Sequence, residues 1–128
     1  MPESYPEAAL RHSADADHLA ASGHLDGAGY LIGFAVECAI KYAIMMARPA
    51  VGAPHIHMPK LIDGAKKALQ GRRKHAMFTV LEKAAFMQNW AIEVRYAGHG
   101  AVNADQYGQW RQDANRALAA ASLRRSQP

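Results

Sequence analysis

Apolar residues recur at steps of three and four along most of this chain, and no segment alternates apolar and polar residues as a strand does. Together with the positions of Pro, Gly and capping residues, this spacing predicts helices at about residues 4–22, 26–47, 59–71, 77–96 and 103–124. The pattern therefore predicts an all-α protein, an up-and-down helical bundle of about five helices.

The second predicted helix is apolar on almost every side and is expected to be the central element of the bundle. Asp26 is its expected N-cap, and Arg48-Pro49 ends it, because the residue before a proline is pushed out of the helical region. The helix is long enough to suggest a membrane span. However, Glu37 and Lys41 lie near its middle, and each charged residue at the centre of a membrane-spanning helix costs roughly 2.5–3.5 kcal/mol of insertion free energy. We expect a buried helix with no membrane contact.

The other helices differ in how clearly their buried face is marked. In the first, Leu10, Ala14 and Ala21 fall near one face and form a thin apolar stripe. The fourth is expected to run unbroken from Met77 to Tyr96. The fifth opens with Asn103 as N-cap and Gln106 three residues later. Its expected inward residues are Tyr107, Trp110, Ala114, Ala117 and Ala121.

Length and charge narrow the class of protein. The chain has 128 residues, 15 Lys and Arg against 11 Asp and Glu, a formal charge of +4 and a pI near 9.4. This length buries a core without disulfide or metal staples, so we expect a single domain over residues 1–128, with its core at about 8–122 and a polar tail at 125–128. The single cysteine, Cys38, forms no internal disulfide, and no leader pattern is evident, which favours the cytoplasm.

A basic cluster spans the end of the third predicted helix and the turn after it. Its members are Lys66, Lys67, Arg72, Arg73 and Lys74. Such a cluster binds nucleic-acid phosphates through counterion release, so these residues are candidate nucleic-acid contacts. The alternative is a solvated face whose charge complements the helix dipole.

No motif in the sequence indicates a metal or a cofactor. The seven histidines include His55 and His57, yet HExxH and CxxC are absent, and His12, His18 and His24 are six residues apart, which does not place them on one helix face. The glycines match neither dinucleotide-binding nor P-loop spacing. We expect no metal and no cofactor.

The candidate catalytic residues lie between residues 89 and 100. Arg95 supplies a fixed positive charge for a phosphodiester, Tyr96 a hydrogen bond or stacking surface, and His99 an acid or base near neutral pH. In the alternative, Arg95 pairs with the buried Glu37, Tyr96 packs in the core and His99 is a solvated turn residue. Glu37 needs a partner in either case, and Lys41 one turn later is the local choice for a structural ion pair.

Several of these segments resemble the HEPN domain family, helical domains associated with nucleotidyltransferases and RNA. The stretch from Asp26 to Lys41 resembles the family's second helix, and His57 followed by Leu61 resembles the entry to its third. The stretch from Trp90 to Tyr96 resembles its "RY" helix end, and the closing helix with Trp110 and Ala114 sits where the family has one. The likeness covers roughly residues 8–122.

The resemblance implies a bundle that pairs into homodimers. In active members an Arg-x4-6-His motif forms a metal-independent ribonuclease site at the dimer interface. Here Arg95 matches and His99 follows after three residues instead of four to six. Members without the full motif resemble binding or partner modules, often encoded with a minimal nucleotidyltransferase.

Three hypotheses follow. The first is a dimeric module that binds RNA, a nucleotide or a nucleotidyltransferase-type partner. The second is a metal-independent endoribonuclease of toxin-antitoxin type that uses Arg95 and His99, with Tyr96 positioning the substrate. The third is a dimeric scaffold without nucleic-acid contact, which would show no salt-dependent retention on RNA.

Overall fold

The fold was analysed in a computed structural model that describes residues 4–71 and 75–123, except the side chain of Arg95. The predicted contacts Arg72, Arg73 and Lys74 and the tail 125–128 lie outside the described residues. The elements, in order, are α1 (Tyr5–Ala21), α2 (Leu25–Ala47), α3 (Lys60–Ala68), α4 (Ala76–Leu81), the 3-10 helix η1 (Ile92–Tyr96) and α5 (Ala104–Ala120). No strand occurs in this part of the chain, and the predicted all-α bundle is confirmed.

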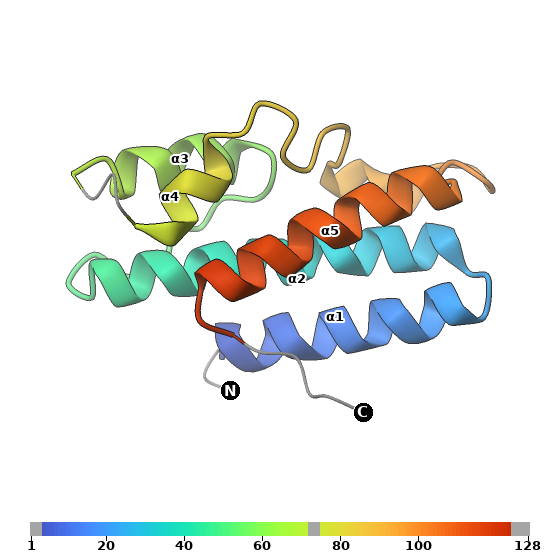
Figure 1. Cartoon of the computed structure of the whole chain (residues 1–128), viewed down its shortest axis with the longest axis horizontal. Helices are drawn as coiled ribbons and strands as arrows, with labels where there is room; N and C mark the ends of the chain where they lie inside the picture. The colour runs from blue at the N-terminus through green and yellow to red at the C-terminus, as the bar shows by residue number, and fades with distance from the viewer. Residues whose placement is uncertain (1–3, 72–74, 124–128) are drawn as a thin grey trace.

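The bundle is organised around α2, which packs against both α1 and α5. Figure 1 shows α1 running antiparallel to α2, and α5 running in the same direction as α2. The short helices α3 and α4 cover the C-terminal half of α2, while the chain around η1 returns to its N-terminal end (Figure 1). As predicted, α2 is the central element.

Helix α1 begins and ends where the sequence predicts, but its buried face is different. The buried residues are Ala9, Ser13 and Ala16, whereas Ala14 and Ala21 are exposed. The expected stripe followed the larger apolar residue Leu10, which is only partly buried. Small side chains occupy the contact with α2 instead, because they let two helices approach closely.

Helix α2 is buried along most of its length. It is long and apolar enough to cross a membrane by length and composition alone, but 61% of its most apolar window is buried inside the protein. That burial is typical of the core helix of a packed bundle. Its N-cap is His24 and not Asp26, which lies in the first turn and binds a distant loop, as described below.

The predicted fourth helix is wrong as a continuous element. Helix α4 ends at Leu81, turns follow, and η1 begins only at Ile92. Met87 and Asn89 have positive φ angles of 51° and 72°, in the left-handed region that a continuing helix excludes. Where the helix stops, backbone groups bond to residues elsewhere in the fold instead of to the next turn. The Met87 amide, for example, donates to Asp113 Oδ2 at 2.9 Å.

The apolar residues of this stretch have helical spacing, but contacts with other parts of the chain bury them. Phe86, Met87 and Trp90 are all buried against the core. The Trp90 ring lies on Gly33 of α2, where a Cβ would overlap it, and its Nε1 donates to Gly29 O at 2.8 Å. Gly33 is therefore the position at which the backbone of α2 admits the indole ring.

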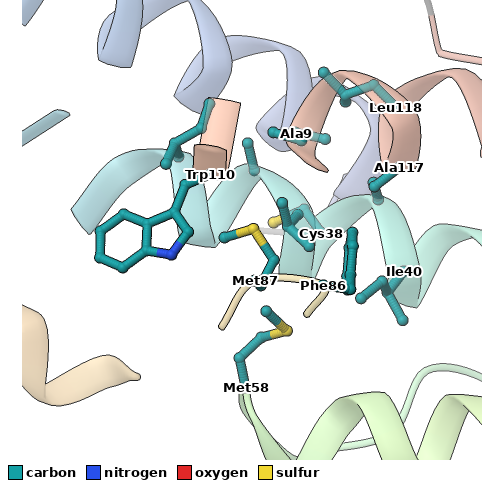
Figure 2. Close-up of a cluster of buried hydrophobic side chains, with 14 of the residues drawn as sticks. Ala9, Cys38, Ile40, Met58, Phe86, Met87, Trp110, Ala117 and Leu118 are labelled. Atoms are coloured by element: carbon teal, nitrogen blue, oxygen red, sulfur yellow. The ribbon is translucent and has the colours of Figure 1, made fainter. Parts of the chain in front are cut away.

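The core draws on every layer of the bundle. Figure 2 shows side chains converging from four parts of the chain, namely Ala9 of α1, Cys38 and Ile40 of α2, Met58, Phe86 and Met87 of the connecting segments, and Trp110, Ala117 and Leu118 of α5. Cys38 is buried. The start of α5 is confirmed, since Asn103 Oδ1 accepts from the Gln106 amide at 2.7 Å.

Candidate functional site

The three predicted catalytic residues lie on one short surface segment, residues 92–100, which we call the η1 segment. Arg95 and Tyr96 are the last two residues of η1, and His99 lies in the turn that follows. Tyr96 is 74% exposed, so the part of the alternative that packs Tyr96 in the core is wrong, whereas the exposed turn position that the alternative gave His99 is confirmed. The Arg95 side chain lies outside the described atoms. The expected α-helical "RY" end is a 3-10 turn instead.

A carboxylate on α2 holds the η1 segment in place. Asp26 Oδ2 accepts from the Gly100 amide and Oδ1 from the Val102 amide, both at 2.9 Å. These bonds, first from Val102 and then from Gly100, lower the pKa of Asp26 below its ordinary value, and nearby His99 lowers it further. The sequence placed Asp26 at a helix start, but its carboxylate caps the turn after His99 instead.

The anchored turn borders a hollow of about 660 Å³ between the start of α2 and the η1 segment. Two imidazoles and a carboxylate, those of His24, His99 and Asp26, line this hollow, along with Gly23 and Val102. His24 and His99 are exposed, whereas Asp26 is partly buried and accepts two backbone hydrogen bonds.

The predicted basic cluster lies elsewhere. Lys66 and Lys67 are in the last turn of α3, where Lys67 is exposed and Lys66 is partly buried. Figure 1 places α3 and the η1 segment toward opposite ends of the long axis. The described part of the basic cluster and the Arg95–His99 residues therefore do not form one patch.

A second polar group lies halfway along α2, where Glu37 is 4% exposed. The predicted ion pair is present, with Lys41 Nζ 3.3 Å from Glu37 Oε2. Two further donors, which the sequence did not suggest, complete the arrangement: His57 Nδ1 lies 2.9 Å from Oε2, and the Met58 amide donates to Oε1 at 3.2 Å. Lys41 also lies over the ring of Tyr5, 5.7 Å from its centroid.

His57 differs from the rest of this cluster in its exposure. Its side chain is 56% exposed, whereas that of Glu37 is 5% exposed. His57 borders a hollow of about 620 Å³ lined on one side by residues 56–60 and on the other by Ala91, Ile92 and Glu93. This second hollow therefore extends from the loop that carries His57 to the start of the η1 segment.

The described groups suit acid-base chemistry and contact with nucleic-acid bases. An imidazole hydrogen-bonded to a carboxylate has a fixed ring orientation, and exposed aromatic side chains stack on bases. Across residues 4–71 and 75–123, no group of three or more His, Cys, Asp or Glu side chains is placed to hold a metal ion.

Searches of protein-family models, of curated proteins and of solved structures found no match to this chain.

Proposed function

We propose that this protein is an RNA-binding helical module that contacts unpaired RNA through the η1 segment. The observation that carries the proposal is the exposure of Tyr96, a residue that is 74% exposed and lies between Arg95 and His99 on an anchored turn. Exposed aromatic rings stack on unpaired bases, and arginine contacts phosphate, whatever the base sequence.

The anchoring by Asp26 supports this role. A turn held by two backbone hydrogen bonds to a core helix presents its side chains with less ordering cost on binding than a free loop would. The formal charge of +4 favours an anionic partner in general.

The resemblance to HEPN domains supports the same class of ligand. It extends the proposal to a homodimer in the cytoplasm, with a nucleotidyltransferase-type protein as a further partner. Light scattering of the purified protein tests the dimer.

The test of RNA binding is fluorescence anisotropy with a short, unpaired, labelled RNA at low and moderate salt. We expect binding that weakens with salt, and Tyr96→Ala to lose about 1–3 kcal/mol of binding free energy, the usual range for one stacked base. Arg95→Ala is expected to weaken binding and to reduce its salt dependence.

Arg48→Ala is the matched control for Arg95→Ala. It removes the same charge from an exposed site at the other end of α2, and we expect near wild-type affinity. Wild-type protein that retains no RNA at low salt would contradict the proposal and favour the scaffold hypothesis. Equal losses of RNA affinity in Arg48→Ala and Arg95→Ala would show that binding depends on the net charge of the protein and not on Arg95 in particular.

Cleavage by Arg95 and His99 stays a prediction. Incubating structured RNA with the wild type, Arg95→Ala and His99→Ala in EDTA tests it, since cleavage that both variants lose would establish this pair.

The basic cluster also stays a prediction. The double variant Lys66→Ala/Lys67→Ala is expected to lower RNA affinity only by weakening the salt-dependent electrostatic attraction between protein and RNA.

A further inference from the structure

Charge is divided unevenly along this chain. Residues 42–81 contain seven Lys and Arg and one Asp, a formal charge of +6, whereas the whole chain carries +4. The rest of the chain therefore carries a net charge of −2. Of the seven basic residues, those at 72–74 lie outside the described part of the chain, and the other four lie at the end of α2 and on α3.

Residues 45–52 and 65–69 lie at one end of the molecule, which we call the basic end. Figure 1 shows the end of α2, the start of the loop that follows it and the end of α3 at the same end of the long axis, beyond the start of α1. Arg48 is exposed at the end of α2, and Lys67 is exposed in the last turn of α3 beside the partly buried Lys66. No Asp or Glu occurs at residues 42–62 or 64–81.

The basic end also carries exposed apolar side chains. Met46 is 64% exposed and Val51 is 66% exposed, two of the four large hydrophobic residues that are exposed in the described part of the chain. Pro49 and Ala50 between them are exposed as well. Favourable interaction with helix dipoles explains cations at the ends of α2 and α3, but it gives no reason for exposed aliphatic side chains. Exposed apolar residues rimmed by charge are typical of a membrane or protein contact.

An anionic lipid bilayer fits this combination of groups better than RNA does. Aliphatic side chains do not stack on bases as aromatic rings do, whereas they enter the boundary between headgroups and acyl chains. Lys and Arg beside them attract anionic headgroups. Both contributions are needed, because a single apolar anchor gives only marginal membrane binding. The shape agrees, since a projecting end reaches a flat bilayer without obstruction by the rest of the bundle (Figure 1).

We propose that the basic end is a docking surface for an anionic lipid bilayer. Met46 and Val51 enter the headgroup region. The lipid phosphates contact Arg48, Lys66 and Lys67. Helix α2 stays packed in the bundle, so this is contact with a membrane surface and not a span. The proposal departs from the expectation of no membrane contact, which considered α2 only as a possible span, and it is independent of RNA binding by the η1 segment.

The test is sedimentation of the full chain with vesicles of phosphatidylcholine, alone or mixed with phosphatidylserine. We expect binding only to the mixed vesicles, and weaker binding as salt is raised. Val51→Asp replaces an apolar contact with a charge that the bilayer repels, so it should lower the partition coefficient about 10-fold or more. Lys66→Ala/Lys67→Ala should lower it about fivefold for each lysine. Gln109→Asp adds the same negative charge at an exposed position on α5 and is the matched control, expected to bind as wild type does.

A further variant reports insertion directly. Val51→Trp places an indole in the exposed loop, and it should strengthen vesicle binding because tryptophan favours the membrane interface. Its fluorescence should shift to the blue with mixed vesicles and be quenched by brominated lipid, while the buried Trp90 and Trp110 give an unchanged background. Circular dichroism compares the fold of each variant with that of wild type.

The outcomes distinguish a bilayer from other occupants. Wild type that stays in solution with mixed vesicles at low salt overturns the proposal. Vesicle binding that Val51→Asp retains, or Val51→Trp fluorescence that mixed vesicles leave unchanged, overturns the assignment to the basic end. A dimer that Val51→Asp breaks in light scattering, without vesicle binding, would mean that this surface joins two copies of the chain. RNA binding that Lys66→Ala/Lys67→Ala abolishes, again without vesicle binding, would make it an RNA contact.

Discussion

Two carboxylates on α2, those of Asp26 and Glu37, accept hydrogen bonds from different loops of the molecule. Asp26 and Glu37 are separated by about three helical turns and so lie on nearly the same face of the helix. Each accepts backbone N–H groups from a distant loop, Asp26 from residues 100 and 102 and Glu37 from Met58. Only Glu37 is buried with an ion-pair partner and a histidine.

The difference shows how burial changes the task of a similar group. Asp26 lies near the surface, where two amides suffice to hold a turn. Glu37 lies where an uncompensated charge is costly, so it collects three donors. One of these donors, His57, has a side chain that is more than half exposed. The buried carboxylate of Glu37 therefore also orients an imidazole that solvent reaches.

The largest effect that this comparison predicts is on Glu37→Ala. Removing the carboxylate leaves Lys41 buried without its counter-charge, and breaking such a pair costs about 3–5 kcal/mol. Urea denaturation measures this loss. Asp26→Ala is the paired control, and we expect a smaller drop in its unfolding midpoint. Equal losses at the two sites would show that burial does not separate them.

Gly33, one of three glycines between the two carboxylates, gives the next effect. In Gly33→Ala the new methyl group overlaps the Trp90 ring, and overpacking of this kind costs about 1–3 kcal/mol or more. Gly108→Ala in α5 is the matched control, since nothing lies near its Cβ position. It should stabilise the protein by roughly 0.5–1 kcal/mol through helix propensity. Differential scanning calorimetry follows both variants, and a Gly33→Ala protein as stable as wild type would contradict this packing.

The two exposed histidines sharpen the comparison at smaller scale. His57→Ala loses its hydrogen bond to Glu37, and we expect a cost of about 0.5–1.5 kcal/mol in chemical denaturation. His99→Ala, at an exposed turn position, should change stability by no more than about 0.5 kcal/mol. The reverse order would mean that His99 and not His57 is the histidine held by the fold.

The smallest effect concerns acid stability. The pKa of Asp26 is lowered in the folded protein, chiefly by the amides of Val102 and Gly100. Its contribution to stability is therefore present above its ordinary pKa of 3.8 and is lost as the pH falls through the lower, folded value. Asp26→Asn should remove this part of the pH dependence, measured as the urea midpoint against pH. An unchanged acid slope would contradict the two amide bonds.

Helical periodicity and capping residues were enough to predict most of the fold. The apolar second helix, the Asn103 cap and the inward face of α5 follow from local rules of spacing and hydrogen bonding. The fourth helix failed because Phe86 and Trp90 have helical spacing but are buried by long-range contacts. Periodicity does not distinguish these two causes of burial.

The candidate site was predictable only in part. A buried Glu four residues before Lys41 is a local pattern, and the ion pair was found from it. His57 is twenty residues from Glu37, and no spacing rule links a helix residue to a loop at that distance. Likewise, Asp26 was assigned a capping role in its own helix, because the turn that it binds lies far along the chain.

The most direct test of RNA binding by the η1 segment is an amide NMR titration of the full chain with an unpaired RNA oligonucleotide. We predict that the largest shifts fall on residues 91–100 and on the neighbouring loop at His57. Shifts confined to α3 and the basic cluster, or no shifts at low salt, would contradict the account.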